Sequence, residues 1–147
     1  MEDNKKNNFK SIIDKLRSSG LRPTRQRLLI CKVLFGENKD FHFTAEDLDK
    51  IIKNNNEAKI SLATIYNTLH SLKKCGYLNE VSISGNKTYF DTNTTSHHHF
   101  FDEANNSLTD ISENEVEIKK IPIAPKGKKI KTAQVLIRLE NDNHNQN

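Results

Sequence analysis

Three consecutive histidines, His97, His98 and His99, are the residues of this sequence best suited to chemistry. They lie in the stretch DTNTTSHHHFFDEANNSLTD, which begins at Asp91, ends at Asp110 and separates two segments of strand-like composition. Successive side chains of a strand point to opposite faces, so His97 and His99 are predicted to share a face that excludes His98. Two imidazoles flanked by two carboxylates provide the nitrogen and oxygen donors of a divalent-metal site. Metal binding is therefore predicted here, with haem binding by His97, His98 or His99 as the open alternative.

Cysteine content and hydropathy exclude several classes of protein. The 147 residues include two cysteines, Cys31 and Cys75, and neither belongs to a Cys-x-x-Cys pair. A disulfide framework and a four-cysteine structural zinc site are therefore not expected. No apolar run is long enough to cross a membrane and no apolar signal segment opens the sequence, which predicts a cytoplasmic protein without a membrane partner.

Positive charge is concentrated in the N-terminal part of the chain. Residues 1–90 contain 16 Lys and Arg against 10 Asp and Glu, a net charge of +6. Residues 91–147 contain 7 against 9, a net charge of −2. The N-terminal part is therefore the one expected to meet a polyanion.

Four amphipathic helices are predicted in this basic part. The first covers residues 9–18, and the second covers residues 24–35. The third opens at Thr44, which forms an approximate capping box with Asp47. The fourth, residues 61–74, begins at a serine suited to capping and carries an apolar stripe formed by Leu62, Ile65, Leu69 and Leu72.

The opposite face of the fourth helix is small, uncharged and rich in hydrogen-bonding groups. Its residues are Ala63, Thr64, Asn67, His70 and Ser71, with Tyr66 at the edge. Such a face fits a DNA major groove, where a bulky charged face would be held away from the bases. Residues 78–91 follow as a β-hairpin with Gly and Asn in its turn. Helices followed by this hairpin predict a winged helix-turn-helix domain in residues 1–91, with residues 61–74 as recognition helix.

The remaining residues are predicted to form a small α/β dimerisation and sensing module, which makes the whole chain α+β. Three strands are expected at residues 97–101, 108–111 and 133–139, with a short helix possible in SENEVEIKK. So small a module with exposed strand edges requires a partner. The module is assigned to residues 92–140, and residues 141–147 to a disordered tail.

The motifs LRPTRQR, TAEDL, SLATIYNTL and the histidine-rich strand, taken together, resemble the ferric uptake regulator (Fur) superfamily over residues 21–139. The continuous stretch FDTNTTSHHHFFDE, with no Cys-x-x-Cys after it, looks like the Irr branch of iron response regulators. This resemblance implies a homodimeric transcriptional regulator, mainly a repressor, that binds DNA under iron or haem control.

The resemblance also implies a regulatory metal site that joins the two domains. Its ligands would be His42, Asp91, His97, His99 and Asp110. Imidazole and carboxylate without thiolate suit Fe(II) or Mn(II), and Zn(II) in vitro. No structural zinc is implied, because residues 102–105 are Asp-Glu-Ala-Asn where many relatives have cysteines.

For DNA, the resemblance places Tyr66 against thymine methyls and Arg22 toward a minor groove. Asn67 stands where many relatives have arginine, and asparagine reads adenine, so an A/T-rich palindromic site is predicted. Phosphate contacts are assigned to Arg25, Arg27 and Thr64. The full set of predicted DNA-binding residues is Arg22, Arg25, Arg27, Ser61, Ala63, Thr64, Tyr66 and Asn67.

Three rival functions remain. A peroxide sensor of the same superfamily would use the same ligands, and peroxide would then add oxygen to His42 or His97. A metalloenzyme is disfavoured because the sequence lacks a His-Glu-x-x-His helix and a His-x-Asp facial triad. A haem-storage protein would have no use for the uncharged recognition face.

Overall fold

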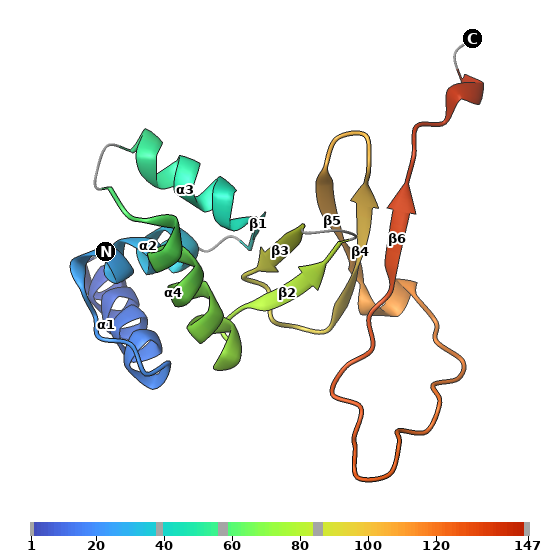
Figure 1. The fold of residues 1–147 in the computed structure, drawn as a ribbon, viewed down its shortest axis with the longest axis horizontal. Coiled ribbons are helices and arrows are strands. Elements are labelled where there is room, and N and C mark those ends of the chain that lie inside the picture. Colours follow the sequence, from blue (N-terminus) through green and yellow to red (C-terminus); the bar gives the residue numbers. More distant parts are fainter. Residues whose placement is uncertain (1, 38–39, 56–58, 84–86, 146–147) are drawn as a thin grey trace. The chain divides into compact units, whose positions relative to one another are not determined.

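The computed structural model describes residues 2–37, 40–55, 59–83 and 87–145, with the backbone alone for residues 2–9. The chain divides into two compact units, Met1–Thr94 (unit 1) and Thr95–Asn147 (unit 2). Unit 1 is mainly helical and unit 2 is mainly β-sheet, which confirms the α+β class (Figure 1).

Four helices make up most of unit 1, and their starting points follow the expected caps. They are α1 (Glu2–Ser18), α2 (Arg25–Phe35), α3 (Ala45–Asn54) and α4 (Leu62–Lys74). Thr24 and Ser61 cap α2 and α4, and Thr44 forms a capping box with Asp47 at the start of α3. The helix predicted at residues 9–18 starts seven residues earlier, because acidic residues near its N-terminus favour helix where no apolar stripe marks it.

The core of unit 1 lies among these helices. Leu16, Ile30, Leu48, Ile65 and Leu69 are completely buried. One member of the predicted apolar stripe differs, because the side chain of Leu62 is 40% exposed. It is the first residue of α4 and precedes the part of the helix that packs on the core.

A small antiparallel sheet completes unit 1. Its strands are β1 (His42–Phe43), β2 (Asn79–Ser82) and β3 (Thr88–Asp91), in the order β1-β3-β2. The predicted hairpin corresponds to β2 and β3, and its turn at residues 84–86 lies outside the described residues. The two-residue strand β1 was not predicted, since it is too short to show an alternating pattern.

Unit 2 contains a three-stranded sheet with β4 (His97–Asp102) in the middle. Strand β5 (Ser107–Ser112) lies antiparallel on one side, and β6 (Leu136–Leu139) lies parallel on the other. All three strands correspond to predicted ones, although β6 begins three residues later than expected. The short helix allowed in SENEVEIKK is the 3-10 helix η1 (Glu113–Glu115), and the tail predicted to be disordered contains the 3-10 helix η2 (Asn143–Asn145).

Among the described residues, no helix is both long enough and apolar enough to span a membrane.

Candidate functional site

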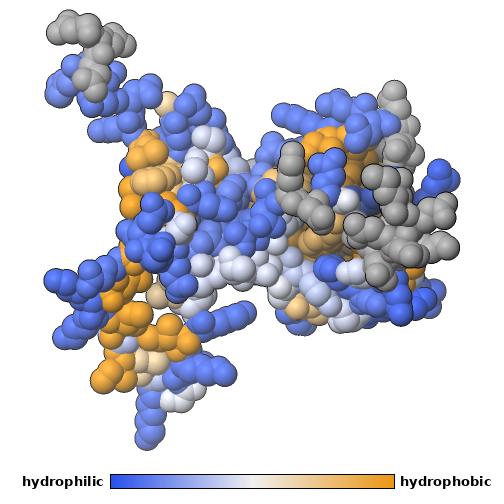
Figure 2. Space-filling view, turned by 180° about the vertical axis from the view of Figure 1, so that it is seen from behind, coloured by the Kyte–Doolittle hydropathy of each residue, from blue (hydrophilic) through white to orange (hydrophobic). Residues whose placement is uncertain are grey.

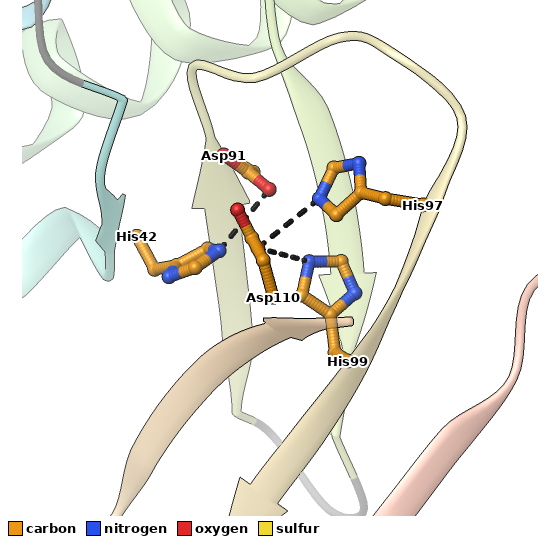
Figure 3. A group of neighbouring side chains, drawn as sticks. All are labelled: His42, Asp91, His97, His99 and Asp110. Carbon is orange, nitrogen blue, oxygen red and sulfur yellow. Dashed lines mark ion pairs between the residues drawn. The ribbon is translucent and has the colours of Figure 1, made fainter. Parts of the chain in front are cut away.

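In unit 1, the pairing of two strands places His42 against Asp91. The two residues are directly opposite each other in the β1–β3 ladder. His42 Nε2 lies 3.2 Å from Asp91 Oδ2 (Figure 3). Asp91 is fully buried, and its Oδ1 accepts a hydrogen bond from the backbone N–H of Asn93 at 2.8 Å. A buried carboxylate loses its hydration and needs hydrogen bonds or an opposite charge in its place. The contacts of Asp91 with His42 and Asn93 supply them, so the pair is part of the structure of unit 1 and not a chance surface contact.

In unit 2, the ladder between β4 and β5 brings three further predicted ligands together. Asp110 is directly opposite His99, and His97 lies two residues along the same strand face. Asp110 Oδ1 is 3.2 Å from His97 Nε2 and 3.3 Å from His99 Nε2 (Figure 3). The ligand atoms of the three residues lie within 4.8 Å of one another, as a shared metal ion would require.

A backbone contact determines which nitrogen of His97 is available. His97 Nδ1 lies 2.6 Å from the carbonyl oxygen of Thr95. A carbonyl can only accept, so Nδ1 carries the hydrogen and, in the neutral ring, Nε2 keeps its lone pair. Ligand histidines of metal sites are oriented by this kind of contact on their other nitrogen. The Nε2 atom that faces Asp110 is therefore the one prepared to bind a cation.

His98 points to the opposite face, as strand alternation predicts. Its ring is buried, and its Nδ1 accepts a hydrogen bond from the backbone N–H of Val135 at 2.9 Å. His98 therefore attaches the chain entering β6 to the central strand. One of its two ring nitrogens is already in use, which separates its role from that of His97 and His99.

The donor set fits a divalent metal of intermediate hardness. In unit 2, two imidazole nitrogens and one aspartate carboxylate suit Fe(II), Mn(II) or Zn(II), and in unit 1 the imidazole of His42 and the carboxylate of Asp91 are donors of the same kind. Thiolate ligation is not available from Cys31, because burial raises the pKa of its thiol from 9.0 to about 12. The other cysteine, Cys75, is exposed, and its Sγ contacts the carbonyl oxygen of Ser18.

The residues predicted for the recognition face lie at the start of α4 and differ in exposure. Ser61, Ala63 and Asn67 are exposed, and Thr64 is half-buried. Tyr66 is 38% exposed, and its hydroxyl donates a hydrogen bond to Glu46 Oε1 of α3 at 2.8 Å. This bond is the main cause of the raised pKa of Tyr66. Sequence reasoning missed Glu46, because a contact between two helices leaves no periodic signal.

The three arginines of the predicted cluster differ in exposure and in hydrogen bonding. Arg22 and Arg25 are exposed. Arg27 is half-buried, its backbone N–H donates to Thr24 Oγ1 at 3.3 Å, and its Nη1 donates to the carbonyl oxygen of Arg22 at 3.3 Å. Arg27 thus supports the loop that presents Arg22, in addition to the predicted phosphate contact.

Comparison with known proteins identifies relatives of this fold and site. The sequence model of the ferric uptake regulator family matches residues 18–138. The peroxide-responsive repressor PerR of Staphylococcus aureus is 32% identical over 108 residues, which are 71% of either chain.

Solved structures with the same fold include two ferric uptake regulators. The manganese-containing Pseudomonas aeruginosa protein has a TM-score of 0.65 at 20% identity, covering 88% of this chain and 97% of that one. The Helicobacter pylori protein, described as having three functional metal-binding sites, has a TM-score of 0.66 at 19% identity and covers 89% of both chains.

A helical DNA-binding unit followed by a β-rich unit with histidine and aspartate ligands defines a metal-dependent transcriptional regulator. The chain belongs to the ferric uptake regulator family, whose members are DNA-binding regulators that act as dimers and are not enzymes.

Proposed function

We propose that this protein is a cytoplasmic, metal-dependent repressor that releases DNA when peroxide oxidises its metal site. The observation that carries the proposal is the pairing of His97 and His99 with Asp110. The contact of His97 Nδ1 with the Thr95 carbonyl oxygen leaves the lone pair of Nε2 to coordinate a metal. The similarity to the Staphylococcus aureus peroxide-responsive repressor supports peroxide as the signal.

In this proposal one metal ion is held by ligands of both units. His42 and Asp91 would come from unit 1, and His97, His99 and Asp110 from unit 2. Binding would fix the angle between the units, and therefore the spacing of two recognition helices in a dimer. An ion bound more tightly in the DNA-competent arrangement must strengthen DNA binding by the same factor.

Peroxide sensing would follow from the imidazole ligands themselves. Bound Fe(II) would supply the one-electron chemistry that activates peroxide beside its ligands, and the imidazole ring would supply the two electrons of the net oxidation. One oxygen atom of the peroxide is added to the ring carbon between the two nitrogens of His42 or His97, and the other leaves as water. The oxidised ring is a poorer ligand, so the metal is lost and the spacing of the recognition helices is no longer fixed.

Mass spectrometry of the peroxide-treated protein tests this proposal. After loading with Fe(II), we expect peptides containing His42 or His97 to gain one oxygen atom, and loading with Mn(II) to prevent the gain. His144 is exposed and outside the proposed ligand set, so it serves as an internal control. Equal oxidation of His144, or an unmodified His42 and His97 after DNA release, would contradict the proposal.

The DNA half of the proposal rests on the exposed, uncharged face of α4. Asn67 is exposed at the predicted base-reading position, and Tyr66 is held by Glu46 at the edge of the same face. We infer an A/T-rich palindrome as the target, since asparagine matches the hydrogen-bonding edge of adenine. Phosphate contacts are assigned to Arg25, Arg27 and Thr64, and Arg22 would reach toward a minor groove.

The second candidate is the Irr-like response to iron or haem that the sequence motifs suggest. The observation that favours it is the continuous histidine-rich strand without any cysteine in residues 95–147. The family comparisons lend support to the peroxide-responsive alternative instead. Haem would have to compete with the metal for His97 or His99, because His98 Nδ1 is bonded to Val135. Release of DNA by haem, without oxidation of His42 or His97, would favour this candidate.

A further inference from the structure

The hydroxyl of Tyr66 on α4 is bonded to a residue of another helix of unit 1. It donates a hydrogen bond of 2.8 Å to Glu46 Oε1 on α3, although the two residues are 20 positions apart in the chain. This bond is the largest cause of the raised pKa of Tyr66. At neutral pH the hydroxyl therefore keeps its hydrogen and donates it to the carboxylate.

Glu46 is not needed to cap its own helix, because the neighbouring Asp47 does so. Asp47 Oδ2 accepts a hydrogen bond from Thr44 N–H at 2.9 Å, and Thr44 Oγ1 accepts one from Asp47 N–H at 3.1 Å. The carboxylate of Glu46 instead reaches α4. A hydrogen bond between two exposed groups replaces bonds to water and contributes only modestly to stability. The bond is therefore better explained by its effect on the Tyr66 ring.

Tyr66 belongs to an exposed apolar pair on α4. Among the side chains that the structure describes, the large apolar ones exposed in unit 1 are Leu62, at 40%, and Tyr66, at 38%. Four positions apart on a helix, the two residues lie on the same side. The other exposed apolar side chains belong to unit 2, where Figure 2 shows apolar surface bordered by hydrophilic residues. In a DNA major groove, the apolar group available to such a pair is the methyl group of thymine.

A carboxylate beside Tyr66 has a cost for DNA binding. Glu46 carries a negative charge 2.8 Å from the hydroxyl of a side chain proposed to enter the major groove, and DNA phosphates repel that charge. A neutral residue in its place would bind DNA of any sequence more tightly. The carboxylate suits a regulator in which discrimination between sequences, a difference of affinities, matters more than overall affinity.

We propose that Glu46 is a positioning residue for sequence recognition, which orients the Tyr66 ring against thymine methyl groups. With its hydroxyl held, the ring has less freedom to lose when it meets a methyl group. The single hydrogen of the hydroxyl is committed to Glu46, so the ring makes the base contact and not a donated hydrogen bond. The inference rests on the proposed contact of Tyr66 with DNA and is independent of the signal that releases the DNA.

Replacement of thymine by deoxyuridine measures this contact, because uracil differs from thymine only by lacking the methyl group. The first probe is an operator selected from random DNA by the unmodified protein, and the second carries deoxyuridine at every thymine. The full chain is titrated with both at fixed salt in the presence of Mn(II). One buried methyl group in each half-site should make the uracil operator bind about 10-fold more weakly. We expect Tyr66→Ala to abolish this preference.

Variants of both partners separate the hydrogen bond from the charge. Glu46→Gln keeps an acceptor oxygen without the charge, so it should retain the thymine preference and bind all DNA more tightly. Glu46→Ala and Tyr66→Phe each remove the bond and should reduce the preference to about 3-fold or less. Combined, they should reduce it no further, because both remove one interaction. Glu37→Gln is the matched control, since it makes the same charge change at an exposed residue outside α3 and α4.

Three results would overturn the proposal in variants whose circular dichroism melting curves verify folding. The first is an unchanged thymine preference in Glu46→Ala when Tyr66→Ala has lost it, because Tyr66 would then contact thymine without Glu46. The second is an equal loss in Glu46→Gln and Glu46→Ala, because the charge and not the hydrogen bond would be responsible. The third is an unchanged preference in Tyr66→Ala, which would remove the proposed base contact as well but leave the proposed metal and peroxide response standing.

Discussion

At the scale of single residues, the proposed metal binding depends on imidazoles that the β-ladders hold against carboxylates. His99 is buried and directly opposite Asp110, with 3.3 Å between Nε2 and Oδ1. His99→Ala removes a ligand, and we expect Mn(II) affinity, measured by isothermal titration calorimetry, to fall at least about 100-fold. His144→Ala is the control, because that residue is exposed in the tail. A similar affinity in both variants would remove His99 from the site.

The two cysteines are predicted to differ sharply in reactivity. Burial raises the pKa of Cys31 from 9.0 to about 12, so at pH 8 almost none of its thiol is ionised. Cys75 is exposed. A thiol-reactive dye should therefore label about one cysteine per folded chain, and about two after denaturation, with Cys75→Ser abolishing the fast reaction. Rapid labelling of Cys31 in the folded protein would contradict this account and make a thiol-based peroxide response conceivable.

The same pKa shift predicts a dependence of stability on pH. Between pH 9 and pH 12 the unfolded chain loses the Cys31 proton, whereas the folded chain keeps it. Cys31 therefore contributes less to stability as pH rises through this window, and its full contribution is present below it. Replacement by alanine should reduce the alkaline loss of stability, seen in urea unfolding at two pH values.

Much of the candidate site was predictable from residue types, and the remainder depended on tertiary contacts. Strand alternation was sufficient to pair His97 with His99 and to separate His98. The positions of His42 and Glu46 were not predictable in this way. His42 lies opposite Asp91 through a two-residue strand distant in sequence, and Glu46 meets Tyr66 between two helices.

At the scale of elements, the start of α4 connects stability to DNA binding. Ser61 caps this helix by accepting a hydrogen bond from Thr64 N–H at 3.1 Å. Ser61→Ala should lower the free energy of unfolding by about 1 kcal/mol in urea titrations. Ser61→Asp keeps the cap but adds a negative charge, so we expect it to preserve stability and weaken DNA binding. Unimpaired DNA binding by Ser61→Asp would mean that the start of α4 does not approach a phosphate.

Element types were predictable wherever the pattern was long or capped. Capping residues and apolar spacing gave α2, α3 and α4, and alternation gave the hairpin and the strands of unit 2. The pattern failed at α1, whose first turns lack apolar residues, and at β1, which is too short. The order β5-β4-β6, with β6 parallel to β4, depends on long-range pairing that local composition does not encode.

At the scale of the whole molecule, regulation requires that two units respond to one signal. Each unit contributes a histidine–aspartate pairing, His42 with Asp91 in unit 1 and His97 and His99 with Asp110 in unit 2. In the account proposed here, one metal ion links these pairings and selects the arrangement that fits DNA. An ion that binds both arrangements equally would shift neither, so metal and DNA must strengthen each other's binding.

Fluorescence anisotropy on an A/T-rich palindrome, at fixed salt, tests this central claim most directly. We expect Mn(II) to increase DNA affinity by at least about 10-fold relative to chelator, within the usual range of allosteric coupling. Peroxide should abolish binding by the Fe(II)-loaded protein and leave the Mn(II)-loaded protein bound. Equal affinity in metal and chelator would contradict the account, because the histidine–aspartate pairings would then be structural and not regulatory.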